Sequence, residues 1–407
     1  MAEFRNVILG GGVAAAYAAR EYAERGGEPG TLAVVTAEDR APYDRPPLSK
    51  RVLQGEMEPG EAMVEDAGFY AEHGIELSTG TRVVAVDLEN RRLEAADGRE
   101  IGWESLLVAT GSRVLRLDVP GGELGNVFTL RTAGDADRIL GALEDAERAV
   151  VVGGGFIGTE VAASIRQRGL DVALVFREER LLQGRPLAPE MSEQYASTYR
   201  DRGVELLSGE TVVRFEGAAR VERVMLESGR ELEADLVVVG IGVVPETRLF
   251  EGSAVEVDDG IVVDENLRTA VDGVYAAGDV ARWPDPVFGK RRRIEHWDNA
   301  AAQGRHWARS VLGEPEPFVH LPYFFSDAFD LSWEYWGDRE EGDDLVYRGE
   351  VASGSYSAWW LAGERVVAAF VMDRPAEEGE AAMEWIESGE SVDRGRLRDE
   401  ERSLIQP

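Results

Sequence analysis

Short apolar runs that alternate with longer amphipathic stretches run along the chain. Residues 4–9 are mostly apolar, residues 13–25 place apolar side chains at helical spacing, and residues 31–36 are apolar again. Runs of four to eight apolar residues bounded by glycine predict buried strands, and the longer periodic stretch between them predicts a helix. The start of the chain therefore predicts one βαβ unit.

The same pattern returns in the middle of the chain, at residues 149–152, 156–168 and 172–176. Two such units predict two nucleotide-sized domains. Shorter strands are predicted at residues 82–87 and 91–95 (a hairpin), 105–109, 212–215, 220–226, 232–239 and 273–277. A long amphipathic helix is predicted at residues 297–312.

The last part of the chain has a different pattern. From Leu321 on, aromatic side chains crowd alternating strands, and one short helix is predicted at residues 377–387. We therefore predict an α/β fold with two Rossmann-like dinucleotide-binding domains and a C-terminal α+β domain. The predicted boundaries are 1–115 with 247–320 for the first domain, 116–246 for the second and 321–407 for the third.

Composition narrows the function classes. The chain has 407 residues and a formal net charge of −33, so its general field opposes binding to nucleic acid or to an anionic membrane. No apolar run reaches the roughly 18 residues that a spanning helix needs. The first residues lead directly into an apolar strand without the pattern of a signal peptide, so we expect a cytoplasmic protein.

Cysteine is absent, and this excludes redox disulfides, thiolate nucleophiles and thiolate-bound metal centres. The four histidines show no spacing typical of a zinc site, so we expect no metal. Lysine occurs only twice, as Lys50 and Lys290, among 44 basic residues. Because an ammonium and a guanidinium are not interchangeable, a lysine kept in such a chain points to a specific need for an ammonium.

The turn after the first strand carries the fingerprint G-x-G-x-x-A, with Gly10, Gly12 and Ala15 at its fixed positions. Small residues there let the backbone approach a pyrophosphate, and the start of the following helix supplies N–H donors. An acidic residue, Glu38, follows the second strand, where a carboxylate would hold a ribose.

The second turn carries the full fingerprint G-x-G-x-x-G through Gly153, Gly155 and Gly158. The strand that follows ends in Arg177 and Glu178, which give conflicting signals. Glu178 would bind the ribose hydroxyls of NADH, whereas Arg177 would bind the additional phosphate of NADPH. We favour NADH and leave NADPH open.

Further segments support a pair of dinucleotide sites. A run at residues 41–50 follows Glu38, and Ala109, Thr110 and Gly111 follow a buried strand. Gly278 and Asp279 end a later strand, where the carboxylate can bind a ribityl hydroxyl.

These motifs are similar to those of FAD-dependent pyridine nucleotide oxidoreductases with a glutathione-reductase-like fold. The runs at 41–50 and 295–300 resemble the cysteine-free branch of ferredoxin reductases, monodehydroascorbate reductases and apoptosis-inducing factors. Residues 9–22, with Pro29 and Gly30, and residues 329–338 look most like monodehydroascorbate reductase. The resemblance covers about residues 4–375.

The resemblance implies which residues hold each cofactor. The residues implied for FAD are Gly10, Gly12, Ala15, Glu38, Arg45, Lys50, Ala109, Thr110, Gly111, Gly278, Asp279 and Trp297. The residues implied for NADH or NADPH are Gly153, Gly155, Gly158, Glu160, Arg177, Glu178 and Gly242. Lys50 and Glu160 are expected to meet beside the flavin, and Trp297 to stand at its edge at the start of a helix.

The implied activity is hydride transfer from NAD(P)H to FAD, followed by release of single electrons to a separate acceptor. One expected acceptor is a ferredoxin or rubredoxin, because Asp327 stands where monodehydroascorbate reductases carry an arginine for the anionic ascorbyl radical. The alternative is a small radical or quinone, which the 329–338 block favours. A third hypothesis is an NADH-sensing flavoprotein module. The sequence leaves a monomer or a homodimer open.

Two further features bear on the acceptor. Lys290, Arg291, Arg292 and Arg293 form a basic run, which would either dock an acidic electron-transfer protein or act as a loop that balances neighbouring carboxylates. By the same resemblance, Trp359 lies roughly at the position where plant monodehydroascorbate reductases have a tyrosine near the substrate. An exposed group of Trp333, Tyr335 and Trp336 would favour an interface.

Overall fold

The computed structural model describes residues 2–184 and 187–405, and the chain folds into two compact units. The first unit contains Met1–Arg45, Gly60–Arg113 and Val244–His320, and the second contains Pro46–Pro59, Val114–Val243 and Leu321–Pro407. Residues 46–59, which the predicted boundaries place in the first domain, group with the second unit. The C-terminal region, which the sequence predicts as a separate domain, groups with the second unit.

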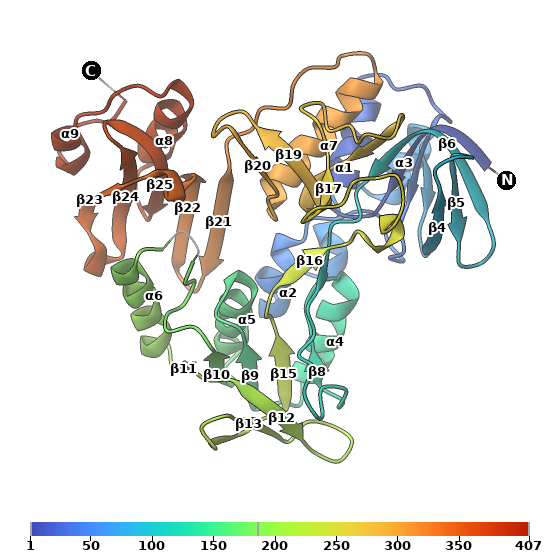
Figure 1. Ribbon diagram of the computed structural model, residues 1–407. Helices are drawn as coiled ribbons and strands as arrows, with labels where there is room; N and C mark the ends of the chain where they lie inside the picture. The colour runs from blue at the N-terminus through green and yellow to red at the C-terminus, as the bar shows by residue number, and fades with distance from the viewer. Residues whose placement is uncertain (1, 185–186, 406–407) are drawn as a thin grey trace. The chain divides into compact units, whose positions relative to one another are not determined.

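The first unit is built on a sheet in which β1 pairs in the parallel direction with β2 and with β6 (Figure 1). Its strand order is β3-β2-β1-β6-β5-β4, with β18 also paired to β6. The strands are β1 (Ala2–Leu9), β2 (Leu32–Val35), β3 (Glu76–Ser78), β4 (Val83–Asp87), β5 (Arg92–Ala95), β6 (Glu100–Val108) and β18 (Val274–Ala276). The predicted hairpin is present, because β4 and β5 pair in the antiparallel direction.

Helices α1 (Val13–Glu24) and α7 (Trp297–Val311) pack against each other in this unit. A Cβ atom on Gly304 would lie 2.2 Å from the carbonyl oxygen of Ala14, so the close approach of the two helices depends on this glycine. The alanines of α1 and the fully buried Trp307 join Ile8 and Leu107 of the sheet in one core.

The remaining elements of the first unit are short. They are α3 (Ala67–Glu72), β17 (Ile261–Val262), β19 (Ala281–Asp285), β20 (Lys290–Arg292), η2 (Pro59–Ala62), η3 (Arg248–Phe250) and η4 (Gly278–Val280). Strands β17, β19 and β20 form a small sheet of their own. Strands β7 (Ser112–Val114) and β16 (Val243–Pro245) form a separate two-stranded sheet.

The second unit contains a fully parallel sheet with the order β11-β10-β9-β15-β8. Its strands are β8 (Val127–Phe128), β9 (Arg148–Val152), β10 (Asp171–Phe176), β11 (Val204–Ser208) and β15 (Leu236–Val239). The helices that accompany it are α2 (Arg51–Gln54), α4 (Ala133–Leu143), α5 (Phe156–Gln167) and α6 (Pro189–Asp201). Both predicted βαβ units are therefore present, and their elements differ from the predicted ranges only at their ends.

The single strand predicted at 232–239 is wrong. The segment divides into β14 (Glu231–Glu233), which pairs with β13 (Arg223–Leu226), and β15, which pairs with β9. Strand β12 (Val212–Glu216) completes the small antiparallel sheet. Asp235 lies between β14 and β15. Its side chain fixes the chain there, because it accepts hydrogen bonds from the backbone N–H groups of Glu147 and Arg148, at 3.0 and 2.9 Å.

The C-terminal region forms an antiparallel sheet with the order β21-β22-β25-β24-β23. Its strands are β21 (Tyr323–Ala328), β22 (Leu331–Gly337), β23 (Asp344–Glu350), β24 (Ser355–Ala362) and β25 (Arg365–Met372). Helix α8 (Ala376–Ser388) packs on β25 and β22, and a short helix that the sequence did not predict, α9 (Arg394–Arg398), lies beside β23 (Figure 1). Two 3-10 turns are η5 (Arg339–Glu341) and η6 (Val351–Ser353). Trp333, Tyr335 and Trp336 are all buried, so the exposed aromatic group that would favour an interface is not present.

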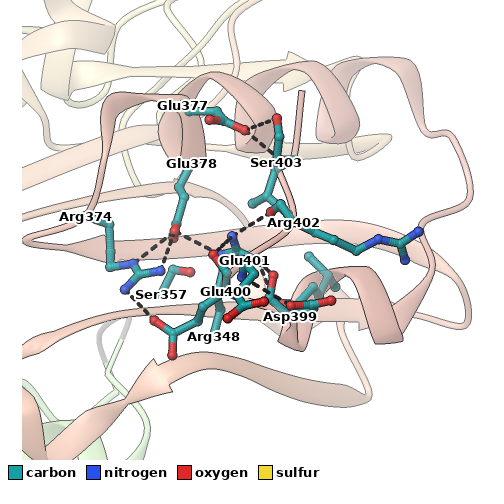
Figure 2. Close-up of polar contacts among 12 residues, drawn as sticks. Arg348, Ser357, Arg374, Glu377, Glu378, Asp399, Glu400, Glu401, Arg402 and Ser403 are labelled. Carbon is teal, nitrogen blue, oxygen red and sulfur yellow. Dashed lines mark hydrogen bonds and ion pairs between the residues drawn. The ribbon is translucent and has the colours of Figure 1, made fainter. Parts of the chain in front are cut away.

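One buried arginine fastens the end of the chain to this sheet (Figure 2). The Arg348 guanidinium donates to the carboxylate of Glu378 and to five backbone carbonyl oxygens between residues 396 and 402. Glu378 also accepts from Arg374, and Glu377 accepts from the backbone N–H of Leu404. The C-terminal segment is therefore held by side chains from β23 and α8.

Candidate functional site

The first glycine turn, between β1 and α1, has the shape that a pyrophosphate requires. Gly10 has φ +137°, and a Cβ atom there would lie 2.1 Å from the carbonyl oxygen of Ala109. Gly12 is the N-cap of α1 and provides no side-chain hydrogen bond to the helix. Unlike Gly10, it has room for a Cβ atom, whose nearest neighbour would be Arg45 at 3.8 Å. No protein atom lies close to the position that a Gly12 Cβ would occupy. The start of α1 therefore leaves space for a bound phosphate.

Glu38 lies after β2, as predicted, within a small polar cluster of the first unit. Arg45 donates to one of its carboxylate oxygens at 2.8 Å, and the hydroxyl of Tyr43 donates to the other at 2.5 Å. These contacts orient the carboxylate at the carboxyl end of a parallel strand, where ligands bind in such sheets. Tyr43 belongs to the 41–50 run but is not among the residues that the family resemblance implies for FAD.

The other predicted residues of the first unit lie near the ends of β6 and β18. Asp279 belongs to η4 and accepts a hydrogen bond from Ser112 at 3.1 Å. Gly278 has φ +79°, and its N–H donates to the side chain of Gln303 at 2.7 Å. Thr110 donates its hydroxyl to the backbone carbonyl of Glu246 at 2.8 Å, so its side chain joins two segments of the first unit that are far apart in the sequence.

Trp297 begins α7, as predicted, and is half-buried. Its indole N–H donates to Asp44 at 2.6 Å, and its ring meets Tyr17 edge to face at 5.8 Å between centroids. Burial raises the pKa of Asp44, and the hydrogen bond from Trp297 opposes that rise. The indole orientation is thus set by an acid that the sequence analysis did not single out.

The second glycine turn, between β9 and α5, repeats the first. Gly153 has φ +120°, and a Cβ atom there would lie 2.3 Å from the carbonyl oxygen of Gly240. A Cβ atom on Gly158 would lie 1.8 Å from the carbonyl oxygen of Gly153, so the helix start packs directly on the turn. Gly155 is the N-cap of α5, and a Cβ atom there would meet nothing within 4 Å. This turn also fits a bound phosphate.

At the end of β10, Arg177 and Glu178 contact each other. The guanidinium Nε donates to the Glu178 carboxylate at 3.1 Å, and the Arg177 side chain is 83% exposed whereas that of Glu178 is 35% exposed. Glu178 is therefore the more enclosed of the two residues that give conflicting signals.

Gly242, which is implied for the nicotinamide cofactor, has φ +112°, and its carbonyl oxygen accepts from the N–H of Leu115 at 2.9 Å.

Lys50 and Glu160 form an ion pair in the second unit. The ammonium nitrogen lies 3.0 Å from a carboxylate oxygen, and the two side chains are 12% and 5% exposed. Hydroxyl groups of Ser49 and Ser326 also donate to this carboxylate. Neither serine was singled out from the sequence, although Ser49 lies in the 41–50 run.

Two residues expected near the acceptor lie in different environments. Asp327 is exposed on β21, an edge strand, and accepts a hydrogen bond from Ser332 at 2.7 Å. Trp359 is fully buried, donates to Ser357 and packs on Trp385. The expectation that Trp359 stands near a substrate is therefore wrong, because its ring is inside the C-terminal core.

Two arginines of the basic run at 290–293 are paired with carboxylates of the first unit. Arg292 pairs with the fully buried Asp285 at 2.8 Å, and Arg293 pairs with Asp259 and Glu295. These guanidiniums balance neighbouring carboxylates, which agrees with the second of the two predicted roles. Lys290–Arg292 form strand β20, however, rather than the predicted loop. Arg291 is the exposed arginine of the run.

Among residues 2–184 and 187–405, no group of three or more histidine, aspartate or glutamate side chains is arranged to hold a metal ion. Within the same residues, no helix combines the length and apolarity that crossing a membrane requires.

Comparison with known proteins adds to this geometry. The pyridine nucleotide-disulphide oxidoreductase profile matches residues 4–304, and the reductase C-terminal profile matches residues 323–406. Monodehydroascorbate reductase of Cucumis sativus, the seedling isozyme, is 38% identical over 93% of this chain and 92% of its own length. The enzyme of the same name from Solanum lycopersicum is 37% identical, over 93% of both chains.

Two solved structures share the whole fold. The ferredoxin reductase for the CYP199A2 system from Rhodopseudomonas palustris has a TM-score of 0.92 at 31% identity and covers 98% of both chains. The covalent putidaredoxin reductase–putidaredoxin complex has a TM-score of 0.93 at 32% identity, covering 99% of this chain and 98% of the other.

Proposed function

Because the chain belongs to the pyridine nucleotide-disulphide oxidoreductase family and is an FAD-dependent NAD(P)H oxidoreductase, we propose that it passes electrons to a ferredoxin- or rubredoxin-type protein. A bound flavin supplies the redox chemistry, since it accepts a hydride from a nicotinamide and releases single electrons. The protein supplies binding, orientation and electrostatics. Disulphide chemistry is excluded despite the family name, because the sequence contains no cysteine.

The first glycine turn is the proposed FAD site. Gly10 and Gly12 let the α1 start approach the pyrophosphate, and Ala15, which is fully buried, keeps α1 close to the sheet. Glu38, oriented by Arg45, is placed to accept from ribose hydroxyls, and Asp279 to accept from a ribityl hydroxyl. Ala109, Thr110, Gly111, Gly278 and Trp297 complete the proposed set.

The second glycine turn is the proposed NAD(P)H site. Gly153, Gly155 and Gly158 bring the start of α5 to the pyrophosphate. We favour NADH over NADPH, because the partly enclosed Glu178 can accept from ribose hydroxyls and opposes a phosphate there. The ion pair with Glu178 also occupies Arg177, the group that NADPH would need. The roles of Lys50, Glu160 and Trp297 beside the flavin, and of Gly242 on the nicotinamide side, stay predictions.

The observation that carries the choice of acceptor is the exposed carboxylate of Asp327. It lies on the edge strand of the C-terminal sheet, at the position where the resemblance to monodehydroascorbate reductases implies an arginine for an anionic radical. A carboxylate there repels a small anion by Coulomb's law. The solved complex of putidaredoxin reductase, a protein of this fold, with putidaredoxin supports a protein acceptor.

A second candidate is reduction of a small radical, as in monodehydroascorbate reductase. The 38% identity to the Cucumis sativus enzyme over 93% of the chain favours it. The 329–338 block, which resembles that enzyme, lies in β22 and the turn before it. In this candidate, the radical would have to bind without help from a cation at position 327.

Anaerobic stopped-flow measurement tests the proposal in two steps. The purified yellow protein is mixed with NADH or NADPH, and the reduced protein is then mixed with putidaredoxin or with enzymically generated ascorbyl radical. We expect faster bleaching of the flavin band with NADH and faster reoxidation by putidaredoxin. Rapid reoxidation by the radical alone would select the second candidate. Slow reduction followed by no reoxidation would indicate the NADH-sensing module instead.

A further inference from the structure

Glu160 is a buried carboxylate held by three donors. It lies in the second turn of α5, and its side chain is 5% exposed. Oxygen Oε2 accepts from the Ser49 hydroxyl at 2.5 Å. Oxygen Oε1 accepts from the Ser326 hydroxyl at 2.6 Å and faces the Lys50 ammonium at 3.0 Å. All four groups belong to the second unit.

Because Glu160 and Lys50 are buried, their hydrogen bonds strongly affect the free energy of the ion pair. Removing a carboxylate and an ammonium from water costs several kcal/mol for each ion, and their mutual attraction offsets this only when further hydrogen bonds satisfy the remaining oxygen and hydrogen atoms. Hydrogen bonds to an ionised group are shorter and stronger than neutral ones, and both serine contacts have that character. The two hydroxyls therefore determine where the carboxylate points.

The Ser49 side of this cluster is tied to α5 at two places. The Ser49 hydroxyl reaches Glu160, and its carbonyl oxygen accepts from the hydroxyl of Ser164 at 2.7 Å, one helical turn further along α5. Ser49 ends the 3-10 turn η1 (Pro46–Ser49), directly before Lys50. The backbone that carries the ammonium is thus positioned by α5 itself.

The Ser326 side comes from the C-terminal sheet. Ser326 is 1% exposed on β21, whereas its neighbour Asp327 points outward, as strand alternation requires. The preceding residue, Phe325, places its ring 5.3 Å from the Lys50 ammonium. One edge strand therefore contacts both members of the ion pair and also carries the exposed carboxylate of the proposed acceptor surface.

The groups behind Glu160 bring no competing charge. Tyr195 and Tyr199 on α6 hydrogen-bond each other, and the Tyr199 hydroxyl donates to the carbonyl oxygen of Thr159. Burial raises the pKa of Tyr195 to about 12, and the nearby Glu160 charge adds to the rise, so the phenol stays neutral. Lys50 therefore pairs with Glu160 without a neighbouring phenolate that would compete for the ammonium.

We propose that Ser326 is a positioning residue of the electron-transfer site: its hydroxyl, delivered by the C-terminal sheet, orients Glu160 so that Lys50 is held still. The inference rests on the proposed function, in which the ion pair acts on the flavin. It assigns the C-terminal sheet a direct part in ordering that pair, in addition to offering a surface to the acceptor.

The two lysines of the sequence allow a direct test. FAD-loaded protein labelled with 13C at the lysine ε-carbon gives two signals, and Lys290→Arg assigns them. An immobilised Lys50 shows two distinct ε-proton shifts. We expect Ser326→Ala to merge them toward a single averaged shift and to slow flavin reduction by NADH about tenfold, roughly the effect of losing one charge-assisted hydrogen bond.

Two matched variants separate positioning from folding. Ser326→Thr keeps the hydroxyl and should preserve both ε-proton shifts. Ser192→Ala removes another buried hydroxyl of the same unit, which donates to the carbonyl oxygen of Leu181 at 2.6 Å, and should leave Lys50 unchanged. Identical Lys50 signals in folded Ser326→Ala and wild-type protein would overturn the inference. The NMR readout uses no nicotinamide and no acceptor, so a failure of the proposed function would appear only in the stopped-flow data.

Discussion

Arg348 and Glu378 form an ion pair inside the C-terminal region, with 3.0 Å between Nε and Oε1 and with side chains that are 5% and 4% exposed. The remaining guanidinium hydrogens bind backbone carbonyls of the last residues of the chain (Figure 2). One side chain therefore joins β23, α8 and the C-terminal segment. Removing Arg348 would leave Glu378 with Arg374 as its remaining cation, and the backbone carbonyls that Arg348 binds would lose a buried donor.

We expect Arg348→Ala to destabilise the C-terminal region by about 3–5 kcal/mol, the usual cost of breaking a buried ion pair. Arg348→Lys should recover little, because an ammonium cannot reproduce the planar fork of donors. Urea unfolding and limited proteolysis measure the effect, with early cleavage expected after residue 394. Arg92→Ala, which removes a pair with Glu100 of half-exposed side chains, serves as control and should change stability by less than about 1 kcal/mol. Equal effects of Arg348→Ala and Arg92→Ala would contradict the clamp.

Substitutions at Gly12 and Gly155 should affect the FAD site and the NADH site independently. Both positions have room for a Cβ atom, so alanine should be accepted by the folded protein and resisted only by a bound pyrophosphate. We expect Gly12→Ala to lower the flavin content of the purified protein. Gly155→Ala should keep the flavin and raise the KM for NADH at least about tenfold.

The absorbance ratio of flavin to protein, together with steady-state kinetics, distinguishes these outcomes. Gly141→Ala on α4, where a Cβ atom also meets nothing within 4 Å, is the matched control and should change neither quantity. If both glycine variants lost flavin, or neither changed, the assignment of one site to each cofactor would be wrong.

Glu178 should set the nicotinamide preference. In Glu178→Ala, the ribose hydroxyls lose an acceptor and Arg177 loses its ion-pair partner. We therefore expect the ratio of kcat/KM for NADH to that for NADPH to fall about 10- to 100-fold. The control Glu179→Ala removes an exposed neighbour that pairs with Arg180 at 3.5 Å and should leave the ratio near its wild-type value. An unchanged ratio in Glu178→Ala would mean that another residue reads the ribose.

His306 should make the protein less stable in mild acid. Burial lowers the pKa of His306 to about 4, with a smaller contribution from Arg309, whereas a histidine in the unfolded chain titrates near 6.5. Between these values the unfolded state binds the proton and the folded state does not, so stability falls as pH falls from about 6.5 toward 4. Above pH 7 the group contributes no pH dependence.

Because the imidazole is partly exposed, solvent screening reduces the loss, and we expect it to stay below about 2 kcal/mol at pH 5. We expect His306→Phe, which keeps a ring against Phe318, to show a smaller decrease in Tm between pH 7 and pH 5 than the wild-type protein. Calorimetry at the two pH values gives the comparison. A decrease of the same size in both proteins would assign the acid sensitivity to other groups.

Local motifs carried much of the prediction. The glycine turns at residues 10–12 and 153–155 combine with apolar runs on both sides, and local sterics alone require this strand–turn–helix geometry, so both βαβ units were predicted. The family resemblance placed Lys50 and Glu160 together, and the structure has them 3.0 Å apart. The break at Asp235 was missed because apolar residues lie on both sides of it, and periodicity does not reveal a change of partner sheet.

By itself, the sequence determined the fold class, the absence of thiol chemistry and the two glycine turns, because these depend on residue type and on spacing within a few turns of chain. Only the tertiary structure decided which distant donors hold each functional group. Ser326 meets Glu160 across more than 160 residues, Asp44 meets Trp297 across more than 250, and Arg293 pairs with Asp259 from a separate segment of the chain. Such contacts follow from strand order and packing, which bring together residues whose own neighbours carry no sign of the partner.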